Sequence, residues 1–259
     1  MIRRILPVLL LVLCAAYAAH GGPQNRPKVL IETNFGDIGL ELHEDQAPIT
    51  VANFLMYVDS GFYNGLLFHR IIDGFMIQGG AYFLSEGTLY MRQTAEPIVN
   101  ESHNGLSNLR GMIAMARTSD PNSATSQFYI NHVDNTALDR AEAADGFGYC
   151  VFGRVLSGMD VVDLIAQTPT VNIGYGFANF PYPTLVYIEK AAAAPPGYWL
   201  AGDLNNDGIV DFGDFAVLAS SLTAESEGPA ADLDGDSQVG AADIALLADN
   251  WLSTADWYQ

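Results

Sequence analysis

One arginine stands inside an apolar run of the sequence that otherwise has the pattern of a β-strand. Residues 68–73 alternate so that Arg70 shares one face with Phe68 and Ile72, while His69 points the other way. A half-buried guanidinium is costly unless a partner uses its charge. The run therefore indicates either a structural ion pair or a charge held ready for a bound molecule.

The residues after this strand favour the second interpretation. Gly74 interrupts the run, and Phe75, Met76 and Gln78 follow before the pair Gly79-Gly80. Glycines let the backbone turn sharply or approach a ligand closely. An arginine, two large apolar side chains and a glutamine at the end of a hairpin would form a small apolar pocket with a polar clamp at its lip.

The stretch 68–80 resembles the signature of the cyclophilin-type peptidyl-prolyl cis-trans isomerases, and we assign residues 27–190 to a cyclophilin-like domain. The resemblance implies an enzyme that accelerates rotation about X-Pro bonds in proline-containing polypeptides. The residues that it implies in this stretch are the catalytic Arg70 and Gln78 and the substrate-binding Phe75 and Met76.

Further motifs extend the resemblance downstream. They lie at residues 104–117 and 126–130, and the segment 146–153 places a tyrosine where many relatives carry histidine. The substrate-binding residues implied here are Ala116, Gln127, Tyr129, Leu138 and Tyr149.

One departure from the family pattern keeps an alternative open. Ala137 stands where relatives carry tryptophan or another aromatic residue, so the rim of the groove would be wider and shallower. The alternative is a non-catalytic module that binds proline-containing peptides, tethered to the cell surface or to a partner. Isomerisation needs no acid, base, metal or nucleophile, so we expect no cofactor for catalysis. We also expect no chemical role for His69, His103 or His132, the last two being ordinary surface residues.

Many short strands and two helices must position these residues. Segments 48–58 and 159–166 have the apolar spacing of helices, and segment 81–97 is expected to be a surface loop. This arrangement indicates a mainly β fold, and the resemblance implies a closed eight-stranded antiparallel β-barrel with a helix capping each end. The expected strands include 29–33, 37–42, 111–116, 127–131, 149–155 and 184–188.

Residues 1–19 have the features of a secretory signal peptide. Arg3 and Arg4 precede an apolar run, and Ala16-Tyr17-Ala18 matches a small-residue cleavage site. The run is too short for a comfortable membrane span, and Leu13 is large where a lipoprotein signal needs a small residue. We therefore expect a secreted, periplasmic or cell-surface protein with no integral membrane span and no lipid anchor.

Acidic residues are concentrated at the C-terminal end of the chain. The 259 residues carry a net charge of −19, and residues 201–259 hold 12 Asp and Glu but no Lys or Arg. Such a charge excludes nucleic acid as a natural partner. The asymmetry indicates a separate unit at 201–259, which follows a Pro- and Ala-rich linker at 191–200.

The acidic unit contains two copies of a calcium-binding pattern, each followed by an apolar helix. Oxygen-bearing side chains recur at loop positions 1, 3, 5 and 12, and position 7 offers a backbone carbonyl. The pair resembles the EF-hand-like loops of dockerin modules, which implies a small α-helical domain, two Ca²⁺ ions and a cohesin-like protein partner. The expected ligands are Asp203, Asn205, Asp207, Ile209, Asp211 and Asp214 in the first copy and Asp232, Asp234, Asp236, Gln238 and Asp243 in the second.

Overall fold

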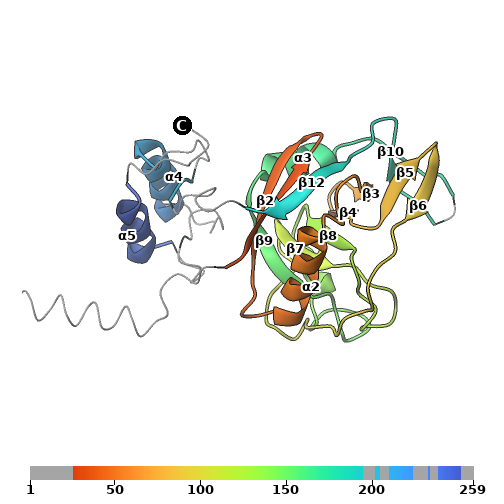
Figure 1. The fold of residues 1–259 in the computed structure, drawn as a ribbon. Helices are drawn as coiled ribbons and strands as arrows, with labels where there is room; N and C mark the ends of the chain where they lie inside the picture. Colours follow the sequence, from red (N-terminus) through yellow and green to blue (C-terminus); the bar gives the residue numbers. More distant parts are fainter. Residues whose placement is uncertain are drawn as a thin grey trace, which may run out of the picture. The chain divides into compact units, whose positions relative to one another are not determined.

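A computed structural model of the chain describes residues 26–174, 176–194, 202–204, 210–223, 233 and 239–251. These residues form two compact units, a large one that begins at residue 27 and a small one within residues 202–251. The large unit is a curled sheet with short helices, and the small unit holds a pair of helices (Figure 1). The expected signal peptide, residues 1–19, lies outside the described residues.

Eight strands of the large unit make one antiparallel sheet, so the predicted mainly β class is confirmed. The strand order across the sheet is β12-β1-β2-β9-β7-β8-β4-β3. The strands are β1 (Lys28–Thr33), β2 (Gly36–Leu42), β3 (Phe68–Ile72), β4 (Met76–Gly79), β7 (Met112–Met115), β8 (Phe128–Asn131), β9 (Val151–Ser157) and β12 (Ile188–Ala193).

The sheet curls into a half-barrel that does not close, so the predicted closed barrel is wrong in this respect. Among the described residues, the edge strands β12 and β3 form no ladder with each other. The segments just before the two strands are joined by three backbone hydrogen bonds and an isolated bridge between Leu67 and Tyr187. The bonds run from the Phe68 N–H to the Val186 carbonyl at 3.0 Å, from the Ile188 N–H to the Leu66 carbonyl at 2.8 Å, and from the Gly65 N–H to the Ile188 carbonyl at 2.7 Å. A few backbone hydrogen bonds therefore hold the seam where a closed barrel would have a full ladder.

The last strand lies further along the chain than the predicted segment 184–188. Strand β12 pairs with most of β1, from Ile188 opposite Thr33 to Ala193 opposite Val29. The alanines at 191–193, whose composition predicts linker, belong to this strand. They form strand because β1 offers a row of otherwise unpaired backbone groups.

A hairpin replaces part of the surface loop predicted at 81–97. Strands β5 (Tyr82–Ser85) and β6 (Thr88–Met91) pair through a two-residue turn. Both turn residues have positive φ, 50° at Glu86 and 76° at Gly87, as a type I′ turn requires. A second small pair, β10 (Thr170–Val171) and β11 (Phe180–Pro181), lies later in the chain.

The two predicted helices of this unit are confirmed as α2 (Pro48–Asp59) and α3 (Met159–Ala166), at opposite ends of the curled sheet (Figure 1). Helix α2 begins at Pro48, where the missing N–H costs nothing. Its next two N–H groups, of Ile49 and Thr50, donate to the buried Glu101 carboxylate at 3.2 and 2.7 Å. Glu101 therefore caps the helix from a distant loop, since Ala47 has no capping side chain.

Aromatic side chains join α2 to the inner face of the sheet. The Phe54 ring lies 5.2–5.5 Å from the rings of Tyr63, Phe128 and Phe152, and all four side chains are fully buried. Such ring pairs add to the stabilisation from burial. They fix β8 and β9 against the helix. The side chains on the opposite face of these strands, such as Tyr129 and Val151, belong to a separate cluster.

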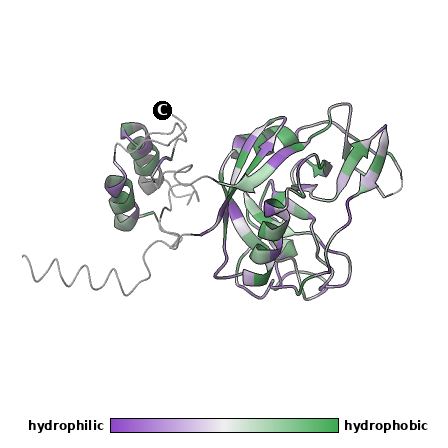
Figure 2. Cartoon of the chain, viewed as in Figure 1, coloured by the Kyte–Doolittle hydropathy of each residue, from purple (hydrophilic) through white to green (hydrophobic). Residues whose placement is uncertain are grey.

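The small unit contains α4 (Phe212–Thr223) and α5 (Ala241–Asp249), so the helix predicted after each loop is confirmed. Both helices are largely hydrophobic in Figure 2. Val210, Leu218 and Leu247 form their buried cluster. None of the helices that the structure describes combines the length and the apolarity of a membrane span.

Candidate active site

A β-bulge at His69 sets the direction of Arg70. In the β3–β4 ladder, Phe68 pairs with Gly79 and Arg70 pairs with Gln78, so β3 uses one residue more than β4. An extra residue of this kind redirects the side chains on either side of it. Phe68 is fully buried in the core, whereas Arg70 is half-buried outside it. The predicted common face of Arg70 and Phe68 is therefore wrong.

Arg70 begins a row of residues that crosses the sheet on the face opposite the core. The strand registers place Arg70 beside Gln78, Gln78 beside Tyr129, and Tyr129 beside Ala114. Neighbouring strands lie about 4.8 Å apart, so the row spans three such spacings. Residues of the same strands that face the core are Ile71, Ile77, Ile113 and Ile130.

A second apolar cluster, separate from the core, lies along this row. It gathers every apolar residue that the sequence singled out for substrate binding. Several of its members are only partly buried, so the cluster offers an apolar surface to a ligand. We call the following residues the apolar patch: Phe75, Met76, Ala116, Tyr129, Leu138 and Tyr149.

Hydrogen bonds link the three predicted polar residues along the patch. Arg70 Nη1 donates to Gln78 Oε1 at 3.4 Å, and Gln78 Nε2 donates to Gln127 Oε1 at 2.9 Å. The guanidinium carbon of Arg70 lies 6.0 Å from the centre of the Phe75 ring. Burial lowers the pKa of Arg70 and the nearby Tyr149 raises it, but a guanidinium remains charged at neutral pH. A cation whose hydrogen bond to Gln78 is long therefore lies beside an apolar surface.

Two residues that the sequence analysis missed hold Tyr129 in place. Its hydroxyl donates to Asn108 Oδ1 at 2.7 Å, and the backbone and side-chain amides of Asn108 donate to Asp139 Oδ1 at 2.7 and 2.8 Å. Burial raises the pKa of Tyr129 well above its ordinary value, so the phenol stays protonated and can donate. Asp139 follows the 3₁₀ helix η2 (Thr136–Leu138) directly, so the same contacts anchor Leu138. Asn108 lies inside the motif 104–117, but its side-chain role has no local signal.

Two further residues fix the backbone of Phe75. Its carbonyl accepts from the His132 N–H at 2.9 Å and from Asn135 Nδ2 at 2.8 Å. The Gly74 N–H in turn donates to His132 Nδ1 at 3.1 Å. The prediction that His132 is an ordinary surface residue is therefore wrong, and its side chain is 13% exposed.

His69 lies buried beside the hairpin β5–β6. Its ring meets the rings of Tyr82 and Phe177 edge-on, at 4.7 and 6.3 Å between centroids. Burial lowers the pKa of His69 to about 4, and contacts with the Leu67 backbone and the Gln127 side chain offset part of this effect. The imidazole is therefore neutral at physiological pH. His103, in contrast, is exposed, as the sequence predicted.

The family model described as "Cyclophilin type peptidyl-prolyl cis-trans isomerase/CLD" matches residues 28–192. The chain belongs to this cyclophilin family. The match includes every residue of the apolar patch, together with Arg70, Gln78 and Gln127. The predicted family and enzyme class, a peptidyl-prolyl cis-trans isomerase, are confirmed.

Bacterial relatives match the cyclophilin part over most of their own length. Peptidyl-prolyl cis-trans isomerase A of Dickeya dadantii is 46% identical over 187 residues, which cover 72% of this chain and 95% of the relative. Peptidyl-prolyl cis-trans isomerase B of Escherichia coli is 52% identical over 147 residues, which cover 56% and 88%.

Solved structures agree with the fold. A cyclophilin-type peptidyl-prolyl cis-trans isomerase of Cryptosporidium parvum has a TM-score of 0.54 and 27% identity, and the match covers 66% of this chain and 98% of that one. A second crystal structure, determined in the presence of the dipeptide Ala-Pro, gives 0.53 and 28% over 65% and 99%.

The C-terminal unit is a second, independent match. The model of the dockerin type I domain covers residues 201–250. The dockerin module predicted from the two acidic loops is therefore confirmed, and the cyclophilin domain of this chain is joined to it.

The described part of the dockerin module fits a hard cation. Asp214 and Asp243, the last ligand expected in each loop, are buried, and each accepts from backbone N–H groups ten and three residues earlier at 2.6–2.7 Å. Carboxylate oxygens are ligands that Ca²⁺ prefers in proteins. Among the described residues, no three acidic, histidine or cysteine side chains converge on a metal position. The remaining expected ligands outside the described residues are Asn205, Asp207, Ile209, Asp232, Asp234, Asp236 and Gln238.

Proposed function

We propose that the chain is a secreted peptidyl-prolyl isomerase in which Arg70 stabilises the twisted X-Pro bond of a protein substrate. The observation that carries the proposal is the half-buried guanidinium beside the apolar patch, with Gln78 and Tyr129 in the same row. A proline ring on the patch would place its nitrogen within reach of Arg70. The residues that we propose to hold the ring are Phe75, Met76, Tyr129 and Leu138.

The physical reason lies in the electronic structure of the X-Pro amide. Rotation has a barrier of about 18–20 kcal/mol, because twisting destroys the amide resonance. In the twisted state the proline nitrogen becomes pyramidal and regains a lone pair. An N–H of Arg70 can donate to that lone pair, which the planar cis and trans states do not offer. Binding that favours the transition state over both ground states is catalysis.

The neighbours of Arg70 strengthen this contact. Gln78 accepts one N–H of Arg70, so it limits the positions that the guanidinium takes. The apolar patch excludes water from the contact, which increases the electrostatic interaction. We propose that Ala116, Gln127 and Tyr149 contact the substrate on either side of the proline.

A protease-coupled proline-isomerisation assay on the wild type and on Arg70→Ala tests this function. We expect the wild type to accelerate isomerisation of an Ala-Pro peptide, and the variant to lose at least about 100-fold of that activity. Thermal unfolding of both proteins controls for folding. Background-level rates for both would leave only a module that binds proline-containing peptides without catalysis.

We propose that the dockerin module directs the enzyme to its place of work. The features of residues 1–19 support export, and the dockerin match supports Ca²⁺ binding at the two loops and docking to a cohesin-like protein partner. Exported proteins fold where uncatalysed X-Pro isomerisation takes tens of seconds or more. An isomerase held there would shorten that step for its neighbours.

Calcium titration of the full chain tests the docking part separately. We expect two binding events by calorimetry, and the loss of one in each of Asp214→Asn and Asp243→Asn, because each variant alters the last ligand of one loop. Isomerase activity should be unchanged in both variants. Titration curves of the variants that match the wild type would remove the proposed sites.

A further inference from the structure

We infer that Arg117 is a positioning residue of the isomerase site, which acts on the substrate through Tyr149. The inference rests on the proposed function, since it assumes that Tyr149 forms one wall of the substrate site. Arg117 follows Ala116 directly, two residues after the end of β7. The sequence motifs predict neither a catalytic nor a substrate-binding role for Arg117.

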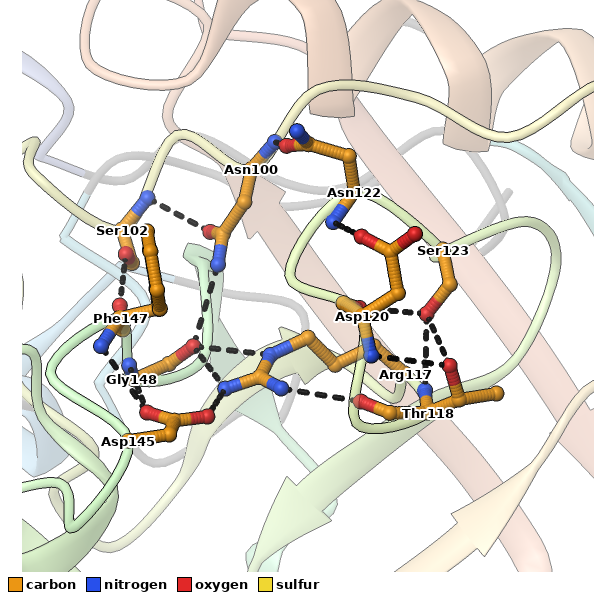
Figure 3. Close-up of polar contacts among 10 residues, drawn as sticks. All are labelled: Asn100, Ser102, Arg117, Thr118, Asp120, Asn122, Ser123, Asp145, Phe147 and Gly148. Carbon is orange, nitrogen blue, oxygen red and sulfur yellow. Dashed lines mark hydrogen bonds and ion pairs between the residues drawn. The ribbon is translucent and has the colours of Figure 1, made fainter.

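All three side-chain nitrogens of Arg117 donate hydrogen bonds to acceptors of the protein itself. Nε and Nη2 both donate to the Gly148 carbonyl, at 3.0 and 2.9 Å, and Nη1 donates to the Thr118 carbonyl at 2.9 Å (Figure 3). Nη2 also forms an ion pair with Asp145. The side chain is only 3% exposed. A guanidinium bound in this way is not free to contact substrate, so any effect on the reaction must pass through its neighbours.

The neighbour that reaches the site is Tyr149. The guanidinium carbon of Arg117 lies 4.4 Å from the centre of the Tyr149 ring, well within the range of a cation–π contact. The same ring meets Tyr129 at 6.0 Å and 77°. The backbone N–H of Tyr149 donates to the Leu138 carbonyl at 2.9 Å. Contacts with Arg117 and with Tyr129 therefore hold the Tyr149 ring in place. The Tyr149 backbone is bonded to Leu138, which is also a residue of the patch.

The loop that carries Tyr149 is fixed at its end by three donor groups. The Gly148 carbonyl accepts from Asn100 Nδ2 at 3.1 Å as well as from Arg117. Gly148 has a φ of 64°, and a Cβ there would lie 2.5 Å from the Arg140 backbone nitrogen, so another residue would not fit. Figure 3 shows that the bonds continue from Asn100 around the loop back to Arg117. The residues on this return path are Asn122, Asp120, Ser123 and Thr118.

The carboxylate of Asp145 stays ionised at neutral pH and well below it. Hydrogen bonds from the Phe147 backbone, from Arg117 and from the Gly148 backbone hold the pKa of Asp145 at about 2. The Arg117–Asp145 pair is therefore a constant part of the scaffold and no pH switch. Lysine cannot reproduce it, because an ammonium lacks the planar fork that bonds one carbonyl twice and stacks on a ring.

A double-mutant cycle with Tyr149 tests the inference. We expect Arg117→Gln and Arg117→Lys to lower kcat/KM about 10-fold in the wild-type background, mainly through KM. In a Tyr149→Ala background, the same changes should cost less than twofold, because the ring on which Arg117 acts is gone. Equal losses in both backgrounds would show that Arg117 acts independently of Tyr149, and the inference would be wrong.

Controls separate this result from unfolding and from a failure of the proposed function. Arg92→Gln removes another arginine, which donates to the Phe62 and Asn64 carbonyls, neither of them in the apolar patch, and should change kcat/KM less than twofold. Asp145→Asn keeps the cation over the ring, so its loss should be smaller than that of Arg117→Gln. Should the wild type lack isomerase activity, the same cycle is measured as the Kd of an Ala-Pro peptide by NMR titration. If Arg117→Gln does not fold, Arg117→Lys carries the cycle, and additivity there is equally decisive.

Discussion

Two arginines flank the apolar patch, and the protein treats their charges in opposite ways. Each nitrogen of Arg117 donates to a carbonyl or carboxylate of the protein, and its side chain is almost completely buried. Among the residues that the structure describes, Arg70 has one side-chain hydrogen bond, at 3.4 Å to Gln78, and it remains half-buried. Desolvating a charge is costly in both places. At Arg117 the protein offsets the cost with its own acceptors, whereas at Arg70 we propose that the substrate does so.

The difference extends to the surroundings of each arginine. We call Arg70, Gln78 and Gln127 the open edge, and the loops at 100–102, 117–123 and 139–148 the closed region. In the closed region, backbone carbonyls and amides of one loop bond side chains of another. Changes at the open edge should therefore alter rate without stability. Changes to satisfied groups that do not contact the apolar patch should alter stability without rate, whereas Arg117 contacts the patch through Tyr149.

The largest expected effect is that of Arg70→Lys at the open edge. A lysine keeps the positive charge but loses the planar fork that reaches Gln78 and a substrate nitrogen together. We expect kcat/KM to fall at least about 100-fold in the coupled assay, while the free energy of unfolding changes by less than about 0.5 kcal/mol.

The matched change in the closed region is Asp120→Ala, at an exposed turn. Asp120 accepts from the Asn122 N–H, on the hydrogen-bonded path that runs from Asn100 back to Arg117. Its kcat/KM should stay within twofold of the wild type. The contrast between the two regions would be absent if Arg70→Lys were as active as the wild type. It would also be absent if its free energy of unfolding fell by as much as its transition-state stabilisation.

The next effect concerns His69, which is adjacent to Arg70 in the chain but buried. The unfolded chain binds a proton at the ordinary pKa of about 6.5, whereas the folded protein does so only near pH 4. Falling pH therefore favours the unfolded state between these values. We expect the free energy of unfolding to drop by about 2 kcal/mol between pH 7.5 and pH 5 because of this group.

Urea unfolding of the wild type and of His69→Asn at both pH values measures this difference. The variant should be less stable at pH 7.5, since it loses buried ring contacts, but its stability should depend less on pH. His103→Asn, at an exposed histidine, should keep the full wild-type slope. An unchanged slope in His69→Asn would mean that the imidazole is protonated in the folded protein.

A third change tests a satisfied charge whose carboxylate bonds helix α2 instead of the apolar patch. Glu101→Ala leaves the first N–H groups of α2 without the buried carboxylate that they donate to. Loss of a helix cap and of a buried acceptor should lower the free energy of unfolding by about 2 kcal/mol, with kcat/KM unchanged. Glu44→Ala, at an exposed acid just before the same helix, should change stability by less than about 0.5 kcal/mol.

Sequence reasoning found the residues of the patch because motif positions do not depend on knowing the sheet register. The apolar residues chosen in this way lie in one cluster, and the polar ones form one hydrogen-bonded chain. The sequence does not predict the bulge at His69, because a pattern of alternating residues gives no sign of an extra residue in one strand. The hairpin β5–β6 had a local signal, Glu86-Gly87, but its flanking residues alternate weakly.

The supporting contacts are beyond any local pattern. Glu101 caps a helix that begins about fifty residues earlier in the chain, and Arg117 bonds a carbonyl 31 residues later. Nothing in the neighbouring sequence marks either pair. Likewise, a closed barrel and the observed half-barrel have the same strands, and only the pairing of β12 and β3 distinguishes them. Long-range contacts of this kind set the geometry of the site, whereas local motifs identify its members.

The smallest expected effect is that of Gln78, the link between Arg70 and Gln127. Gln78→Ala removes the acceptor of Arg70 Nη1 and the donor to Gln127 Oε1. The guanidinium would then take more positions, and we expect kcat/KM to fall about 5- to 10-fold, or about 1 kcal/mol in transition-state stabilisation. Gln78→Glu offers a matched comparison, since it keeps an acceptor for Arg70 but loses the donor to Gln127. A smaller loss in the glutamate variant would show that orientation of Arg70 matters more than the bond to Gln127, and equal losses would place the effect on Gln127 and so on substrate binding.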